Sequence, residues 1–264
     1  MMIFALVLKA VFAGAVVLGL SLTAERLSPR FAGIISGAPL GALISYYLLG
    51  LEKGVDFVTS SVPHAIVGIA GVLMFVVTYH AVSIRAKKRG SLKSTSAGLL
   101  AFVVIAFIVR EFKFTILTAL PVTAGVALLA GILFRRAEDL RVVKPVKLTF
   151  WLLVLRAGMS AILVVSVVTF AKILGPVWAG VLMGFPMIWL PTILIIELTY
   201  SREHAHAMFR GFPVGIGSVV TYLASVPWSF STLGVHVGTL VSLGLALVYL
   251  ASVTVILTQL KHRA

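Results

Sequence analysis

The sequence predicts an all-α membrane protein: a polytopic helical bundle of about nine transmembrane helices, in two inverted four-helix repeats joined by a linking helix. The composition, a duplicated stretch and the placement of positive charge predict this architecture. Of 264 residues, 60% are hydrophobic and only 11% are charged, with a mean hydropathy of +1.13. A water-soluble domain would leave too much of that apolar surface exposed to water. Spans of a membrane β-barrel would alternate in polarity over about ten residues, and no such alternation occurs.

Nine hydrophobic segments approach the length needed to cross a hydrocarbon core of about 30 Å. They are residues 2–22, 30–50, 63–84, 96–110, 114–134, 148–171, 177–199, 211–228 and 235–258. The first is interpreted as a structural helix, because it contains Lys9 and lacks a clear signal-peptide cleavage site. The fourth is the shortest, and it is either a short span or an interfacial or re-entrant piece.

One stretch occurs twice, with matching positions 147 residues apart (186 − 39 = 147). Between residues 6–39 and 153–186, twelve of thirty-four aligned positions are identical, including two prolines and two glycines in one register. Lys9 and Arg156 form a further pair that keeps a positive charge inside an apolar run. An internal duplication explains the match. The predicted units are a first repeat (1–112), a linking helix with a basic loop (113–147) and a second repeat (148–264).

Positive charge is concentrated in short connections between the segments. Residues 85–93 hold five cations and no acid, residues 135–147 hold five cations and two acids, and the C-terminus carries Lys261 and Arg263. The positive-inside rule places all three in the cytoplasm and the N-terminus outside the inner membrane. It also accounts for the net charge of +14 without nucleic acid. The two repeats are then inverted if the fourth segment crosses the membrane, and parallel if it does not.

The repeated stretch predicts a broken helix in each half. Pro39 and Pro186 each interrupt a segment, beside Gly37 and Gly184. A proline inside a helix removes a hydrogen bond to the carbonyl four residues earlier and crowds that turn. Breaks at matching places near the middle of the bilayer are typical of transporter binding sites, and the free N–H groups of a half-helix suit an anion. The alternative is that the glycines and prolines serve helix packing alone.

The two buried cations favour an anionic ligand. A charge seven or eight residues inside a span costs several kcal/mol unless it is paired or hydrated. Lys9 and Arg156 either extend to the nearer membrane surface or face a central cavity. With them, the expected substrate-binding residues are Lys9, Arg156, Ser36, Gly37, Pro39, Met183, Gly184 and Pro186.

Other candidate sites are weaker. The run from Glu203 to His206 has two histidines beside an acid, and it is interpreted as a solvated loop in preference to a metal site. The chain has no cysteine, and no nucleophile and base occur at a convincing spacing. We expect no catalytic residues, no metal and no cofactor, so the protein is not expected to be an enzyme.

The run SPRFAGIISGAPLGALISYYLLGLEKGVDF resembles the GlpM family of small four-helix bacterial inner-membrane proteins. The resemblance includes the Gly-x-Pro step and the Glu-x-Gly at Glu52 and Gly54, and the second copy keeps the Phe185-Pro186 step. It implies a fused tandem of a unit that elsewhere works as a homodimer, and a link to envelope polysaccharide production. It assigns no catalytic residues.

Together these features predict a transporter or flippase in the lipid bilayer, with a small or lipid-linked anionic substrate held between inverted repeats at the broken helices. The alternative is a non-transporting scaffold or accessory subunit in envelope polysaccharide biogenesis, in which the repeated motif only packs helices. The sequence does not define the oligomeric state.

Overall fold

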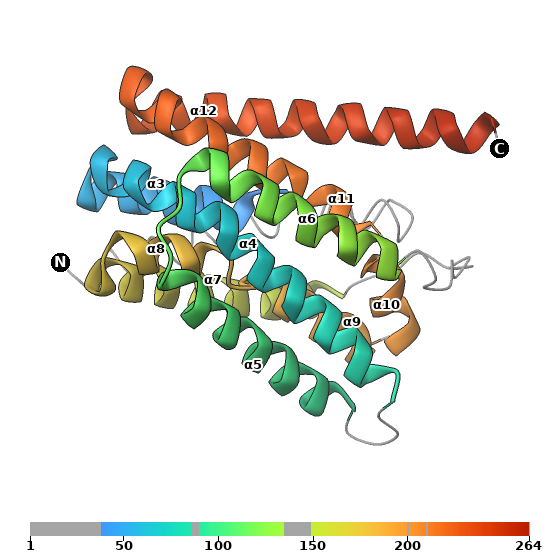
Figure 1. Cartoon of the computed structure of the whole chain (residues 1–264). Coiled ribbons are helices and arrows are strands. Elements are labelled where there is room, and N and C mark those ends of the chain that lie inside the picture. The colour runs from blue at the N-terminus through green and yellow to red at the C-terminus, as the bar shows by residue number, and fades with distance from the viewer. Residues whose placement is uncertain (1–37, 86–89, 135–148, 200, 210, 264) are drawn as a thin grey trace.

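A computed structural model describes residues 38–85, 90–134, 149–199, 201–209 and 211–263, and these residues contain helices and no strand. The helices form one bundle in which α4 lies between α5 and α6 (Figure 1). Their bounds are α3 Leu40–Lys53, α4 Val55–Ser83, α5 Gly90–Arg110, α6 Ile116–Phe134, α7 Phe150–Leu174, α8 Pro176–Met183, α9 Trp189–Thr199, α10 Arg202–Phe209, α11 Phe212–Gly215 and α12 Gly217–Arg263.

Five helical stretches are long and apolar enough to cross a membrane. They are α4, α5, α6, α7 and the stretch Phe212–Gln259, which includes most of α12. Large apolar side chains on their outer faces are exposed, among them Leu117 at 82% and Leu240 at 68%. Exposed leucines on long apolar helices suit contact with lipid, so a helical membrane protein is the fold class that the structure supports.

Several elements differ from the sequence-based prediction, and α5 begins at Gly90, six residues before the predicted fourth segment. The third segment begins eight residues earlier than predicted, because α4 starts at Val55 and continues through Pro63. Residues 202–209 form the short helix α10, and the prediction of a solvated loop there was wrong. Ala205, Met208 and Phe209 of α10 are buried against the bundle, which supplies the apolar contact that keeps this charged segment helical.

Apart from the helix ends around Pro39 and Pro186, most of the described helix ends lie at two ends of the bundle. At one end, which we call the basic end because α4 leads there into a basic connection, Arg202 Nη1 donates to the Ser83 carbonyl at 2.8 Å. At the opposite end, which we call the far end, Lys172 Nζ lies 2.5 Å from Glu52 Oε2. The last residues of α12 also lie at the basic end (Figure 1).

Three glycines connect helices at the far end with the same backbone geometry. Gly54 joins α3 to α4, Gly175 joins α7 to α8, and Gly234 divides α12 into two helical stretches. Their φ angles are 86°, 89° and 74°, and their ψ angles are 171°, 178° and 173°. Only glycine adopts this region without strain, since a Cβ atom there costs about 1–3 kcal/mol.

Replacement of Gly175 tests this geometry. Gly175→Ala should lower the free energy of unfolding by about 1–3 kcal/mol through backbone strain alone, since no atom lies within 4 Å of a Cβ built there. Gly158→Ala, inside α7 with equally open surroundings, should be neutral or stabilising by about 0.5–1 kcal/mol. Thermal unfolding in detergent compares the two, and equal effects would contradict the strain argument.

Candidate functional site

The seventh hydrophobic segment is broken where its sequence predicts a break. Helix α8 ends at Met183 and α9 begins at Trp189, with Pro186 between them. The broken stretch keeps few helical hydrogen bonds: the N–H of Gly184 donates to Val181 at 3.1 Å, and that of Met187 donates to Phe185 at 2.7 Å. The predicted break at residues 184–186 is confirmed.

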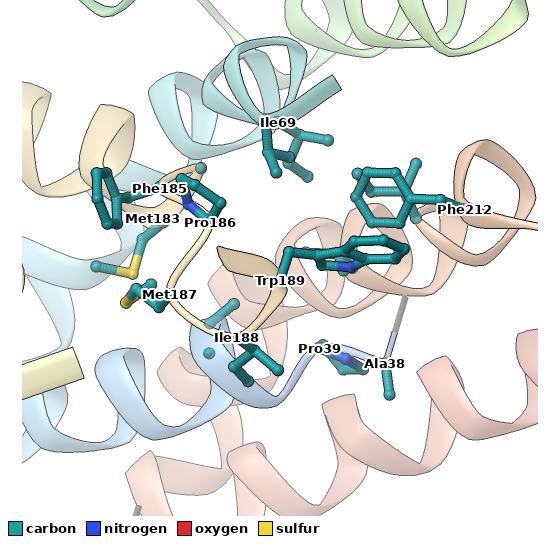
Figure 2. A pocket seen from close by; sticks show the side chains of 16 residues that line it. Ala38, Pro39, Ile69, Met183, Phe185, Pro186, Met187, Ile188, Trp189 and Phe212 are labelled. Atoms are coloured by element: carbon teal, nitrogen blue, oxygen red, sulfur yellow. The ribbon is translucent and has the colours of Figure 1, made fainter. Parts of the chain in front are cut away.

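The break predicted at residues 37–39 is described only from Ala38 onward, so the residues before it lie outside the described part of the chain. Pro39 immediately precedes α3, whose first residue is Leu40. The start of α3 and the break between α8 and α9 line a cavity of about 60 Å³, large enough for a few water molecules (Figure 2). Sixteen residues from α3, α4, α8, α9, α11, α12 and the α8–α9 connection line it: Ala38, Pro39, Gly41, Ala42, Ile69, Val72, Met183, Gly184, Phe185, Pro186, Met187, Ile188, Trp189, Phe212, Ile216 and Val219.

Twelve of these sixteen residues form six pairs that are 147 positions apart. The pairs are Ala38 with Phe185, Pro39 with Pro186, Gly41 with Ile188, Ala42 with Trp189, Ile69 with Ile216 and Val72 with Val219. The duplicated register therefore continues beyond Pro39 and Pro186, into α4 on one side and into residues 214–219 on the other. Residues 67–72 and 214–219 are identical at four of six positions in this register. Low similarity across the intervening residues conceals this continuation in the sequence.

The helices around the cavity also pack between the N-terminal and C-terminal parts of the chain. Helix α4 packs on α8, and α3 packs on α12 near Gly234, where Gly50 meets Phe230 and Val235. Ser61 and Gly68 of α4 meet Gly180 and Gly184 respectively, so α4 and α8 run in the same direction.

The lining is apolar, and two helix N-termini face it. None of the sixteen lining residues carries a charge. Pro39, Gly41 and Ala42 lie at the start of α3, and Ile188 and Trp189 lie at the start of α9. The N-terminal end of a helix carries partial positive charge, although here the Leu40 and Leu190 N–H groups already donate to the Ala38 and Pro186 carbonyls. The cavity thus combines apolar walls with two positive helix ends, which suits a small anion or an anionic group on an apolar molecule.

The predicted site residues are brought together only in part. Pro39, Met183, Gly184 and Pro186 line the same cavity. Arg156 is buried on α7 at 9% exposure, but it is not one of the lining residues. The other three predicted residues, Lys9, Ser36 and Gly37, lie outside the described residues.

Gly180 and Gly184 also serve helix packing. A Cβ built on Gly180 would lie 2.2 Å from the Ser61 carbonyl oxygen, and one on Gly184 would lie 1.9 Å from that of Gly68. Real Cβ atoms do not approach this closely, so these glycines allow α8 to contact the backbone of α4 directly. The packing role considered for this motif is therefore present beside the cavity-lining role.

A polar cluster that the sequence analysis did not predict lies at the basic end. The Tyr79 hydroxyl on α4 donates to Glu197 Oε2 at the end of α9, and Arg202 Nε donates to Glu197 Oε1 at 3.2 Å. Arg202 also bonds the Ser83 carbonyl, and His206 Nε2 lies 3.1 Å from the Ser83 hydroxyl. Only 6% of the Glu197 side chain is exposed. A signal was present in the sequence, since Glu197 is an acid directly following an apolar run.

An aromatic cluster separates this polar cluster from the cavity. Trp189 lines the cavity and packs on Phe212, with ring centroids 4.0 Å apart. Trp189 also contacts Phe209, which in turn meets Tyr79 and the His206 ring. Burial and, to a lesser extent, the neighbouring His80 lower the pKa of His206 on α10 to about 4. His206 is therefore neutral at physiological pH.

Helices α3 and α9 each lead from the cavity to an ion pair. Helix α3 runs from Pro39 to the far end, where Glu52 pairs with Lys172 of α7. Helix α9 runs from Trp189 to the basic end, where Glu197 pairs with Arg202. The two helices therefore leave the cavity in opposite directions.

Among the described residues, no group of three or more histidine, aspartate or glutamate side chains is placed to hold a metal ion. Comparisons with family models, curated proteins and solved structures found no match to this chain.

Proposed function

We propose that this protein is a secondary transporter built from two inverted repeats, with an anionic substrate held in the cavity between the two broken helices. The observation that carries the proposal is the paired lining of that cavity. Residues 147 positions apart line it together, with Pro39 at the start of α3 and Pro186 in the break between α8 and α9. Interrupted helices at matching places of two halves are typical of transporter binding sites.

The directions of the helices support the inversion. Helices α3 and α9 follow equivalent prolines, and they leave the cavity toward opposite ends of the bundle. Helix α5 has 21 residues, enough to cross the membrane, which is the condition for inverted halves. In this proposal the basic end is cytoplasmic, and the protein lies in the inner membrane.

The transport cycle follows from the two ion pairs. Both pairs are formed in the structure, and the cavity between them holds only about 60 Å³. Opening of the Glu52–Lys172 pair exposes the cavity at the far end, and opening of the Glu197–Arg202 pair exposes it at the basic end. Rocking of one repeat against the other opens one end at a time. The cavity size favours a small anion, and a lipid-linked substrate would require the halves to separate further.

An uptake experiment with a variant that fills the cavity tests the proposal. Inorganic phosphate, sulfate and short-chain carboxylates are the probes, first in thermal-shift assays and then in proteoliposomes. Gly41→Phe should reduce uptake of any transported probe by at least about tenfold, because the new ring occupies the space beside Met187 and Ile188. Leu240→Phe, on the exposed face of α12, should leave uptake unchanged. Equal uptake by the parent and Gly41→Phe would contradict a substrate site in this cavity.

The packing of Gly180 and Gly184 on α4 favours a second candidate, a scaffold subunit for envelope polysaccharide biogenesis. The resemblance to the GlpM family points the same way. A scaffold would move none of the probes, and substitution of Gly41 would alter neither thermal shift nor uptake.

A further inference from the structure

A second hollow, much larger than the cavity at the two prolines, lies between α6, α11 and both stretches of α12. We call it the α6–α12 groove, and its volume is about 890 Å³, within the range of about 300–1,000 Å³ that is usual for ligand sites. Ile216 lines both the groove and the cavity, so the residues around it form the wall between the two spaces. The proposed transport site makes no use of this groove.

The lining of the groove offers a ligand apolar surface and no free hydroxyl hydrogen. None of its described residues carries a charge. The hydroxyl groups of Thr123, Thr221 and Tyr249 each donate to a backbone carbonyl, at 2.6, 2.8 and 3.2 Å. A polar ligand would therefore lose its hydration in the groove without gaining these donors in return. The lining favours a hydrocarbon chain, which has no such hydration to lose.

The groove has the length and position of a hydrocarbon chain in one leaflet of the membrane. On α6 it extends from Leu120 to Ile132, twelve residues later, which is about 18 Å of helix. One leaflet contributes about half of a hydrocarbon core of about 30 Å. Helix α6 ends at the basic end, where the rings of Phe134 and His80 have centroids 5.5 Å apart. The groove therefore extends toward the membrane surface at the basic end.

Both helices that border the groove lead into positively charged sequence at the basic end. Leu257 of α12 lines the groove, and Lys261 lies one turn farther on the same face of that helix. Residues 135–147, which follow α6 directly, carry five cations and two acids. Positive charge next to membrane helices at the surface attracts the headgroups of anionic lipids. The charge thus favours an anionic headgroup, as the lining favours a hydrocarbon chain.

We propose that the α6–α12 groove binds one anionic phospholipid, with a hydrocarbon chain along α6 and its phosphate at the level of Lys261. This site is separate from the anion cavity and does not depend on the transport function. The chain fills space between α6 and α12 and supports the wall that contains Ile216. The lipid is then bound as part of the bundle, in contrast to the lipids that cover the exposed leucines on its outer faces.

Native mass spectrometry of the whole chain in detergent measures this binding. The probes are dioleoylphosphatidylglycerol, which is anionic, and dioleoylphosphatidylcholine, which has the same hydrocarbon chains and no net charge. The parent should bind one phosphatidylglycerol at least about tenfold more tightly than a second one. It should also bind that phosphatidylglycerol at least about tenfold more tightly than phosphatidylcholine.

Two pairs of variants test the hydrocarbon chain and the headgroup separately. Gly131→Trp fills the groove, because a Cβ built on Gly131 meets, among the described residues, only Pro213 Cβ at 4.0 Å. It should weaken binding of the first phosphatidylglycerol by at least about tenfold, and Gly125→Trp, on an exposed face of α6 outside the groove, should not. Lys261→Gln should weaken phosphatidylglycerol binding by about fivefold and leave phosphatidylcholine binding unchanged. Lys93→Gln, exposed near the start of α5, should change neither.

Ala124→Trp, at an exposed residue of the same groove wall, is the second filling variant if Gly131→Trp does not fold. Three results would overturn the inference. They are a folded filling variant that binds phosphatidylglycerol as the parent does, equal affinity of the parent for the two lipids, and a dimer of the parent that the filling variant converts to a monomer. The last result would assign the groove to a second copy of the chain.

Discussion

Gly184→Ala should lower the free energy of unfolding by about 3 kcal/mol or more, among the largest effects of any single methyl group in this protein. The added Cβ would lie 1.9 Å from the carbonyl oxygen of Gly68 and 2.3 Å from its carbonyl carbon. Both atoms belong to the backbone of α4, so no side chain can rotate away. Relief therefore requires α8 to move from α4 and widens the cavity that Gly184 lines. Thermal unfolding in detergent measures the loss.

Two variants make this result specific. Gly180→Ala, with its Cβ 2.2 Å from the Ser61 carbonyl oxygen, should destabilise the protein by a similar amount. Gly125→Ala, inside α6 with no atom within 4 Å of the new Cβ, should be neutral or slightly stabilising. Gly184→Ala with the stability of the parent would show that α4 and α8 are not in direct backbone contact.

The same contact shows how much of the site could be predicted. Glycines four residues apart and a following proline predict both close packing and a broken helix from local chemistry alone. The structure confirms both at Gly180, Gly184 and Pro186. It also bears out the prediction of long apolar membrane helices, because the hydrocarbon core of the bilayer sets both the apolar composition and the length of such segments. The inverted repeats and the count of about nine spans remain predictions.

The sequence could not predict cavity residues that matter because of where the fold places them and not because of their residue type. Ile69 and Ile216 are ordinary apolar residues, and only the folded chain shows that both face one cavity. Arg156 was expected beside the prolines because a buried charge is rare, but a side chain on a span can point in any direction around the helix. It lies on α7 outside the cavity lining. Glu197 accepts a hydrogen bond from Tyr79, 118 residues earlier in the chain, and such a separation leaves no local pattern.

Replacement of Trp189 tests whether the paired residues share one space. Trp189 is 5% exposed and packs on Phe212, so Trp189→Ala should cost about 3–5 kcal/mol in the free energy of unfolding. Ala42 occupies the equivalent position of the first half and lines the same cavity at 4% exposure. Ala42→Trp alone should also destabilise, by about 1–3 kcal/mol, because it overfills a packed site.

The double variant is the informative one. If the two side chains face one cavity, the indole introduced at position 42 can occupy the volume vacated at position 189. The double variant should then be more stable than the sum of the single effects predicts, by at least about 1 kcal/mol. Leu43→Trp with Trp189→Ala is the matched control, since Leu43 is buried on the same helix but does not line the cavity. Strict additivity for the Ala42 pair would mean that the two positions do not share a space, and the cavity could not then be a site common to both halves.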